Sequence, residues 1–380
     1  MEGRPNSCCA AEQGPRILSA AVTESNPAET RRAWVDVDLT ALVANARTVR
    51  ERAGVPLLPM VKANGYGLGA VPVARALAQL DPWGFGVATT DEARALREAG
   101  VGRPIIMLSP LAPWMARECL AHQVRPAIGD LDALQAWLAL GNAPFHIEID
   151  TGMSRAGFRP DDQAALASLH ELLVHATGWE GIFTHFHSAD TDAATAGVQW
   201  DLLQEVVRGL GRRPRLVHAS SSAGVFAGPG YSGDLVRPGI FLYGGRVGEF
   251  IPEPVARFQA RVTALRRLHQ GDTASYGATW TGVRPTTLAT ICAGYEDGIL
   301  RSLSNRGRIQ LGENVYPVAG RVTMDMTIVD VGDASVTVGD VATIWGGDVT
   351  LTEQAEIAGT NPYELLTSMG SRVIRRYADG

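Results

Sequence analysis

The stretch Leu57-Leu58-Pro59-Met60-Val61, closed by Lys62, is the first unit of the pattern that decides the fold. A short apolar run of this kind predicts a buried strand, and an Ala- and Leu-rich helical stretch follows it over residues 71–80. The unit then repeats, with a strand predicted over residues 84–88 and a helix over residues 90–99. Six further strand-like runs cover residues 104–108, 124–128, 145–150, 181–187, 215–219 and 235–243, with helical stretches such as 164–175 and 198–210 between most of them.

Eight strands that alternate with helices over about 200 residues favour an α/β fold of the (β/α)8 TIM-barrel type. An open, doubly wound sheet is the alternative, but no Gly-x-Gly-x-x-Gly motif follows the first strand to support it. After Gly245 the helical pattern largely disappears, apart from a short helix predicted over residues 351–358. Strands separated by Gly, Asp and Asn turns are predicted there at residues 260–267, 286–292, 308–311, 315–318, 327–331 and 340–344.

The chain therefore divides into three predicted parts. Residues 1–31 carry no hydrophobic period and are expected to form a disordered tail. Residues 32–245 form the barrel, and residues 246–380 form a mostly β C-terminal domain. A strand near residues 34–38 is a candidate member of the β domain, although it precedes the barrel in the chain.

Composition excludes several classes of protein. The 380 residues include 34 Lys+Arg against 40 Asp+Glu, and a formal net charge of −6 argues against a nucleic-acid platform with its clustered basic face. Hydrophobic residues at 46% and charged residues at 19% are typical of a globular chain. No apolar stretch approaches the ~20 residues that span a bilayer, so no membrane partner is expected. The four cysteines lack the spacing of a zinc site or a disulfide scaffold, which favours a cytoplasmic protein without a structural metal.

Polar residues at the predicted strand ends are the candidates for chemistry, because barrel active sites lie at the carboxyl ends of the strands. Lys62 closes the first strand, where burial would lower its pKa and suit its amine to Schiff-base chemistry. A lysine that extends into solvent is the alternative. In the fifth strand, alternation turns His146, Glu148 and Asp150 into the barrel. Such residues support a site or form a buried polar network that orders the barrel.

The last three strands carry further candidates. His185 and His187 share one face of the sixth strand, so a metal-binding pair is an alternative, although only two nearby aspartates could complete it. Ser220-Ser221-Ser222 ends the seventh strand, and Arg237-Pro238-Gly239 ends the eighth. Loops after these two strands often bind phosphate through backbone N–H groups and hydroxyls, whereas an ordinary serine-rich turn is the alternative.

Eight short motifs are spread in order along both predicted domains. They are Val61-Lys62-Ala63-Asn64-Gly65-Tyr66-Gly67, Asp150-Thr151-Gly152-Met153, Thr184-His185-Phe186, His218-Ala219-Ser220-Ser221-Ser222-Ala223, Val236-Arg237-Pro238-Gly239-Ile240, Ser275-Tyr276-Gly277-Ala278-Thr279, Gly294-Tyr295-Glu296-Asp297-Gly298 and Ala319-Gly320-Arg321-Val322-Thr323-Met324-Asp325. From about Trp34 to Arg376 the chain resembles the alanine racemases, which hold pyridoxal 5′-phosphate in a barrel followed by a β domain.

The resemblance implies a role for each matching residue. Lys62 would bond covalently to pyridoxal 5′-phosphate and serve as one catalytic base, and the other base would be Tyr276 of the partner subunit. A homodimer with shared active sites is therefore expected. The implied cofactor-binding residues are Lys62, Tyr66, His185, Ser222, Arg237, Gly239, Ile240 and Tyr363. The implied substrate-binding residues are Arg155, Tyr295, Arg301, Met324 and Asp325.

The implied reaction is the interconversion of L- and D-alanine by two bases on opposite faces of the α-carbon. Arg237 at the pyridine nitrogen would keep that nitrogen unprotonated, because a guanidinium only donates hydrogen bonds, and this would suppress transamination. A serine or broad-specificity racemase on the same scaffold is the main alternative. A barrel-only pyridoxal-phosphate-binding protein and a fold-related decarboxylase are further alternatives.

Glu148 departs from the family pattern, in which a lysine carried as its carbamate often stands at this position. We expect its carboxylate, seven residues before Arg155, to supply the negative charge that fixes that guanidinium, directly or through a water molecule. Pairing of Glu148 with His146 is the alternative.

Overall fold

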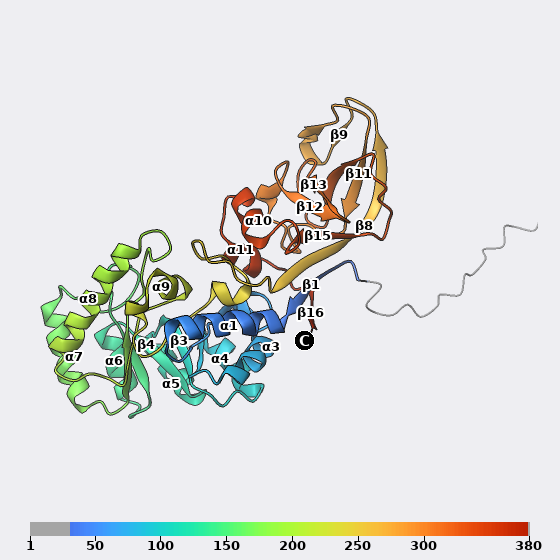
Figure 1. Cartoon of the computed structure of the whole chain (residues 1–380). Coiled ribbons are helices and arrows are strands. Elements are labelled where there is room, and N and C mark those ends of the chain that lie inside the picture. The colour runs from blue at the N-terminus through green and yellow to red at the C-terminus, as the bar shows by residue number, and fades with distance from the viewer. Residues whose placement is uncertain (1–30, 379–380) are drawn as a thin grey trace, which may run out of the picture. The chain divides into compact units, whose positions relative to one another are not determined.

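Six parallel strands of the first half form one continuous sheet in the computed structural model, which describes residues 31–378 (Figure 1). The predicted tail lies, except for Arg31, outside the described residues. Adjacent strands of the sheet are also consecutive in the chain, and every pair is parallel. The strands are β2 (Phe85–Val87), β3 (Ile105–Pro110), β4 (Val124–Ile128), β5 (Phe145–Glu148), β6 (Trp179–Phe183) and β7 (Leu216–His218).

Two irregular strands close this sheet into a barrel. In the first, Met60 bridges Gly86 of β2, and Leu57 bridges Val236 in parallel. In the eighth, Arg237 bridges Ser221, just beyond β7. The segment 57–61 therefore lies between β2 and the eighth strand, which completes a ring of eight parallel strands. The predicted (β/α)8 barrel is confirmed, and an open sheet is excluded.

Amphipathic helices connect the barrel strands. Side-chain oxygens of Asp38, Thr89, Asp130, Asp162 and Asp192 cap five of them by accepting a backbone N–H of the first turn. The helices are α1 (Leu39–Ala53), α2 (Lys62–Tyr66), α3 (Ala70–Leu77), α4 (Thr90–Glu98), α5 (Ala116–Ala121), α6 (Leu131–Leu138), α7 (Gln163–His175), α8 (Ala193–Gly209) and α9 (Ser222–Ala227), with 3-10 turns η1 (Ala78–Leu80), η2 (Pro113–Met115), η3 (Pro229–Tyr231) and η4 (Ile240–Tyr243).

The strand predicted over residues 235–243 is wrong beyond Pro238. The chain turns there into η4, where the Leu242 N–H donates back to the Gly239 carbonyl at 2.8 Å. The apolar run Ile240–Tyr243 is nevertheless buried, because the turn packs against α1. A buried apolar run of four residues therefore does not distinguish a strand from a turn.

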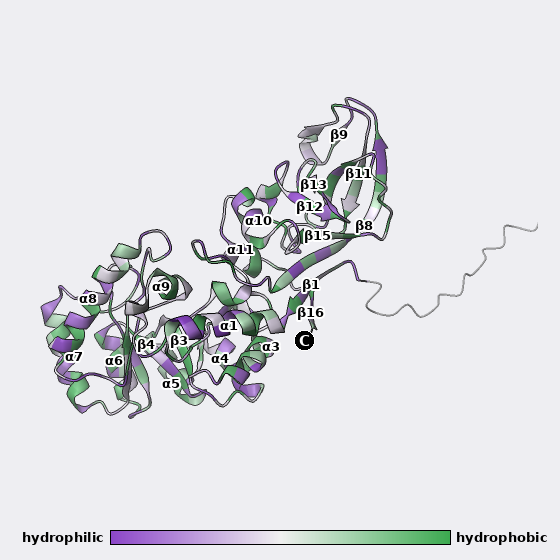
Figure 2. Ribbon diagram, in the orientation of Figure 1, coloured by the Kyte–Doolittle hydropathy of each residue, from purple (hydrophilic) through white to green (hydrophobic). Residues whose placement is uncertain are grey.

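A long central strand, β8 (Ala256–Leu268), organises the second half of the chain. It pairs antiparallel with β1 (Ala33–Asp38), β15 (Val341–Trp345) and β11 (Thr286–Ile291), and β1 in turn pairs parallel with β16 (Ile374–Ala378). Figure 2 shows hydrophilic and hydrophobic positions alternating along β8. The remaining elements are β9 (Thr273–Ala274), η5 (Tyr276–Ala278), β10 (Trp280–Thr281), η6 (Arg301–Leu303), β12 (Arg308–Leu311), β13 (Asn314–Pro317), β14 (Thr327–Gly332), α10 (Leu351–Ala358) and α11 (Pro362–Thr367).

The second half is thus mostly β, as predicted, and β1 from the start of the described chain belongs to its sheet. No helix among residues 31–378 is both long and apolar enough to cross a bilayer.

Candidate active site

The carboxyl ends of the barrel strands surround a cavity of about 310 Å³. Its wall brings together nine of the fourteen residues to which the resemblance assigns a role, and they come from six separate segments of the chain. They are Lys62, Tyr66, Arg155, His185, Ser222, Arg237, Gly239 and Ile240 of the barrel, together with Tyr363 of α11.

Lys62 reaches this cavity from an unusual backbone turn. Ala63, Asn64, Gly65 and Tyr66 have φ values of 52°, 53°, 63° and 53°, so the chain makes a left-handed turn directly after the lysine. Each non-glycine residue in this conformation costs roughly 1–2 kcal/mol, so neighbouring groups must hold it. The Asn64 side-chain oxygen accepts the Ala70 N–H at 3.0 Å and fixes the end of the turn.

Glu92 holds the beginning of the turn, and the sequence analysis missed it. Its two carboxylate oxygens accept the N–H of Ala63 at 2.6 Å and the N–H of Ala88 at 2.8 Å, which ties the ends of the first two barrel strands together. The spacing Thr89-x-x-Glu92 is the signal that could have found it, because it is typical of a capping box at a helix start. Thr89 does cap α4.

Electrostatics prepare Lys62 for nucleophilic chemistry. Partial burial and the nearby positive charge of Arg155 lower the pKa of Lys62, and Glu92 opposes this shift. The direction is the one expected for a lysine that closes a barrel strand. A lowered pKa increases the fraction of neutral amine, which is the nucleophilic form.

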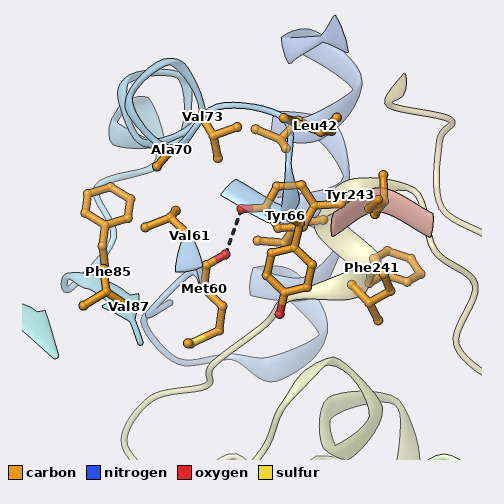
Figure 3. Close-up of a cluster of buried hydrophobic side chains, with 14 of the residues drawn as sticks. Leu42, Met60, Val61, Tyr66, Ala70, Val73, Phe85, Val87, Phe241 and Tyr243 are labelled. Atoms are coloured by element: carbon orange, nitrogen blue, oxygen red, sulfur yellow. Dashed lines mark hydrogen bonds between the residues drawn. The ribbon is translucent and has the colours of Figure 1, made fainter. Parts of the chain in front are cut away.

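Tyr66 and Tyr243 stack on each other, but only Tyr66 lines the cavity (Figure 3). The rings of Tyr66 and Tyr243 lie 4.4 Å apart, and the Tyr243 hydroxyl donates to the Met60 carbonyl at 2.8 Å. Tyr66 instead lines the cavity, where burial raises the pKa of its hydroxyl well above the usual range. A Cβ atom at Gly239 would lie only 2.3 Å from that hydroxyl, so only glycine fits there.

Ser222 and Tyr363 supply further hydroxyls. Ser222 is buried, and its Oγ accepts the N–H of Gly239 at 2.9 Å. Burial raises the pKa of Tyr363 to about 12, so that its hydroxyl stays protonated. The hydroxyls of Tyr66, Ser222 and Tyr363 therefore all belong to residues that line the cavity.

Arg237 is buried, and its hydrogen bonds fix its direction. Its Nη2 donates to the carbonyls of Thr184 at 2.8 Å and Ala219 at 2.7 Å, and its Nη1 donates to His218 Nδ1 at 2.6 Å. His185 Nδ1 lies 3.2 Å from the same Nη2. Burial, followed by the charge of Arg237, lowers the pKa of His185 to about 3, so this imidazole is neutral. Because Nδ1 of His185 faces a group that has only donors, a neutral His185 carries its proton on Nε2.

The strand-five and strand-six expectations are met only in part. Glu148 is buried at the cavity, but it forms no ion pair with Arg155 or His146 among the described residues, and its Oε2 lacks a hydrogen-bond partner. Direct contact with either residue is therefore wrong. Asp150 does not point into the barrel, because its carboxylate accepts two N–H groups of the following turn. His187 bonds to a neighbouring serine rather than facing the cavity, and residues 31–378 hold no cluster of three potential metal ligands.

The five remaining candidates lie in the β domain and do not line this cavity. Tyr276 is 72% exposed and Met324 is 51% exposed. The residues are nevertheless grouped around one loop, 320–326. Ser275 Oγ donates to the Arg321 carbonyl, the Tyr295 N–H donates to the Thr323 carbonyl, and Val322 donates to Ser304 at the end of the Arg301 turn. Asp325, in the same loop, pairs with Arg372 at 2.8 Å.

Comparison with known proteins decides the family. The family model described as the alanine racemase N-terminal domain matches residues 37–247, and the alanine racemase C-terminal domain matches residues 255–377. The chain belongs to the alanine racemase family. An alanine racemase of Deinococcus radiodurans is 37% identical over 358 residues, which cover 91% of this chain and 99% of the relative.

Solved alanine racemase structures share the whole fold. The alanine racemase of Streptomyces coelicolor aligns with a TM-score of 0.86 at 32% identity, covering 93% of this chain and all of the other. An alanine racemase from Bartonella henselae, solved with covalently bound pyridoxal phosphate, aligns with a TM-score of 0.85 at 30% identity, covering 91% of this chain and 99% of that one.

The cavity fits the cofactor of that last alanine racemase. Lys62, Arg155 and Arg237 place three cationic groups around it, whereas Glu148 is the only carboxylate in the lining. An excess of positive charge, together with hydroxyl donors and a lysine amine in the same lining, suits a phosphate-bearing aldehyde.

Proposed function

We propose that this protein is a pyridoxal-phosphate-dependent alanine racemase. One observation carries the proposal: a lysine with a lowered pKa shares a cavity with a buried arginine that can only donate hydrogen bonds. Pyridoxal-phosphate enzymes that need a strong electron sink place a carboxylate at the pyridine nitrogen instead. A weaker sink favours return of a proton to the α-carbon over transfer of the amino group.

The chain's own residues would hold the cofactor at both ends. Lys62 would bond to its aldehyde, and Arg237 would donate to its ring nitrogen. The hydroxyls of Tyr66, Ser222 and Tyr363 and the backbone at Gly239 and Ile240 would bind its phosphate. When bound, pyridoxal phosphate delocalises the negative charge left at the α-carbon after proton removal.

Two bases would then act on opposite faces of the substrate. Lys62 Nζ, freed from the cofactor, would take or return the α-proton on one face. Tyr276 of the partner subunit would do so on the other face, and it must lose its own proton first, since a free tyrosine has a pKa of about 10.

The same proposal includes a homodimer with shared active sites. Support comes from Tyr276, which is exposed on the β domain although the implied reaction needs it beside Lys62. Tyr295, Arg301, Met324 and Asp325 would accompany it as the wall and entrance of the partner's site, and Arg155 would bind the substrate carboxylate.

We also propose a boundary near residue 246 between barrel and β domain; the first family match ends close to it, at residue 247, and the second begins at residue 255. A cytoplasmic location is proposed from the cysteine pattern; in the described chain, Cys119 and Cys292 are both free thiols.

The test combines trapping with product analysis. The purified protein should show a visible absorption band, and borohydride should fix the cofactor onto Lys62, as located by peptide mapping. Chiral analysis should then show D-alanine formed from L-alanine, and Lys62→Ala should lose both band and activity. Lys62 is the only lysine in the sequence, so absence of the reduced adduct from Lys62, or faster turnover of L-serine than of L-alanine, would contradict the assignment.

A further inference from the structure

A row of buried polar side chains runs from Arg237 through the interior of the barrel, away from the cavity. Arg237 Nη1 lies 2.6 Å from His218 Nδ1, and His218 Nε2 lies 2.9 Å from His146 Nδ1. His146 Nε2 lies 3.3 Å from Glu180 Oε2, which also accepts from Arg125 Nε at 2.6 Å. Neither imidazole is exposed at all.

The donors and acceptors at the two ends of this row determine which atom donates in each of its hydrogen bonds. A guanidinium has only donors, so Nδ1 of His218 must be unprotonated, and a neutral His218 then carries its proton on Nε2. That proton is donated to Nδ1 of His146, which therefore carries its own proton on Nε2 and donates it to Glu180. An ionised carboxylate only accepts. Donors at one end and an acceptor at the other thus fix both tautomers.

The surroundings keep both imidazoles neutral and in place. Burial lowers the pKa of both His146 and His218, while Glu180 raises that of His146 and Arg237 lowers that of His218. The His218 ring stacks on Phe183 at 5.1 Å. Gly181 leaves the space for His146, because a Cβ atom there would lie 2.2 Å from His146 Nδ1.

We propose that His146 and Glu180, supported by Arg125, are positioning residues that lock the tautomer of His218 and thereby hold the Arg237 guanidinium in place to donate to the ring nitrogen of the cofactor. This inference deepens the proposed function and rests on it. The reverse tautomer of His218 would set an N–H against Arg237 Nη1 at 2.6 Å. Two donors cannot stay that close, so the guanidinium would shift within the site.

The decisive variant removes the acceptor at the far end of the row. Glu180→Met keeps much of the side-chain volume but offers no oxygen to accept the proton of His146 Nε2–H. Because small displacements in a site cost large factors in rate, we expect kcat to fall about tenfold while KM changes by less than about twofold. Glu180→Gln offers an amide oxygen to the same N–H and should restore kcat to within about twofold of the original value.

Asp36→Leu is the matched control. Asp36 pairs with Arg376 at 2.6 Å, and that guanidinium lies over the Trp34 ring, just as Arg125 pairs with Glu180 and lies over the Trp83 ring. The control therefore loses an ion pair of the same type, although a more exposed one, without an attached imidazole, and its kcat should not change. Equal losses in Glu180→Met and Glu180→Gln, or an equal loss in Asp36→Leu, would overturn the proposal.

A second measurement needs neither cofactor nor substrate. Nitrogen-15 NMR of the histidine-labelled full-length protein, prepared without pyridoxal phosphate, should find His146 and His218 neutral with the proton on Nε2. Glu180→Met should populate a second tautomer. A proton on Nδ1 of either imidazole in the unaltered protein overturns the proposal. Because this readout is independent of turnover, lack of racemase activity would refute the proposed function alone.

Discussion

Removal of the Ser222 hydroxyl tests whether the turn at Gly239 is built for the phosphate of the cofactor. Ser222 is 1% exposed, and its Oγ accepts the Gly239 N–H at 2.9 Å and, less closely, the Phe241 N–H at 3.4 Å. Ser222→Ala leaves the first of these buried donors without a partner, which costs about 1–3 kcal/mol. The longer contact contributes little.

That cost should appear in cofactor binding. In the free variant the turn relaxes to relieve its unpaired N–H, and pyridoxal phosphate must restore the turn when it binds. At 1.4 kcal/mol for each factor of ten, the dissociation constant should rise by about 5- to 150-fold. Titration of the cofactor-free protein, followed through the visible absorption band, measures this change.

Ser220→Ala is the control for a general loss of stability. Ser220 is equally buried and its Oγ donates to the Tyr231 carbonyl at 2.7 Å, but it does not line the cavity. It should lower the free energy of unfolding by a comparable amount and leave cofactor affinity within about twofold. Equal affinities for Ser222→Ala and the unaltered protein, or equal weakening by both variants, would refute the reasoning.

Three further predictions follow from the site. Mixed Lys62→Ala and Tyr276→Phe subunits should regain about a quarter of the original activity, since half of the random dimers carry one intact shared site; no recovery after proven subunit exchange would contradict the shared site. Glu148→Gln should raise the KM for alanine by about fivefold through loss of a carboxylate near Arg155, and added bicarbonate should not change the activity of the unaltered enzyme. Unchanged kinetics of the variant, or activity that depends on bicarbonate, would contradict this role of Glu148. Burial lowers the pKa of His185 to about 3 and also lowers the pKa of His146 and His218. As the pH falls, these histidines therefore bind protons in the unfolded chain but not in the folded chain. This contribution to the free energy of unfolding is fully present above about pH 6.5, and below that pH it should fall by up to about 1.4 kcal/mol per pH unit for each histidine. A free energy of urea unfolding that does not change between about pH 7 and 5 would contradict this.

The sequence by itself determined the elements whose signal is local. Eight apolar runs, most of them followed by a helical stretch, predicted the strands of the barrel, because each run is read from neighbours in the chain. A lysine at the end of the first such run predicted the nucleophile, since barrel strands all end at one face. Strand alternation likewise predicted that His146 and Glu148 lie inside the barrel, and both are buried there.

Only the tertiary structure decided what those inward groups contact. Glu148 lies near Arg155 in sequence yet forms no ion pair with it, whereas His146 bonds to His218, 72 residues away. Strand alternation predicted that Asp150 points into the barrel, but its carboxylate instead accepts two N–H groups of the turn after β5. The approach of side chains from different strands depends on barrel closure, which no short stretch of sequence encodes.

Contacts between the two ends of the chain also depend on tertiary packing, so the sequence did not predict which segments would pair. β1 pairs with β16 across about 340 residues, as the register Asp36↔Arg376 records, and α11 brings Tyr363 to the barrel cavity. Glu92 serves its own helix through a local capping pattern, but its bond to Ala63 exists only because the first two barrel strands lie side by side. Local hydrophobic period and turn chemistry thus determined the strands, the helices and the candidate nucleophile, while packing between distant segments determined which side chains surround it.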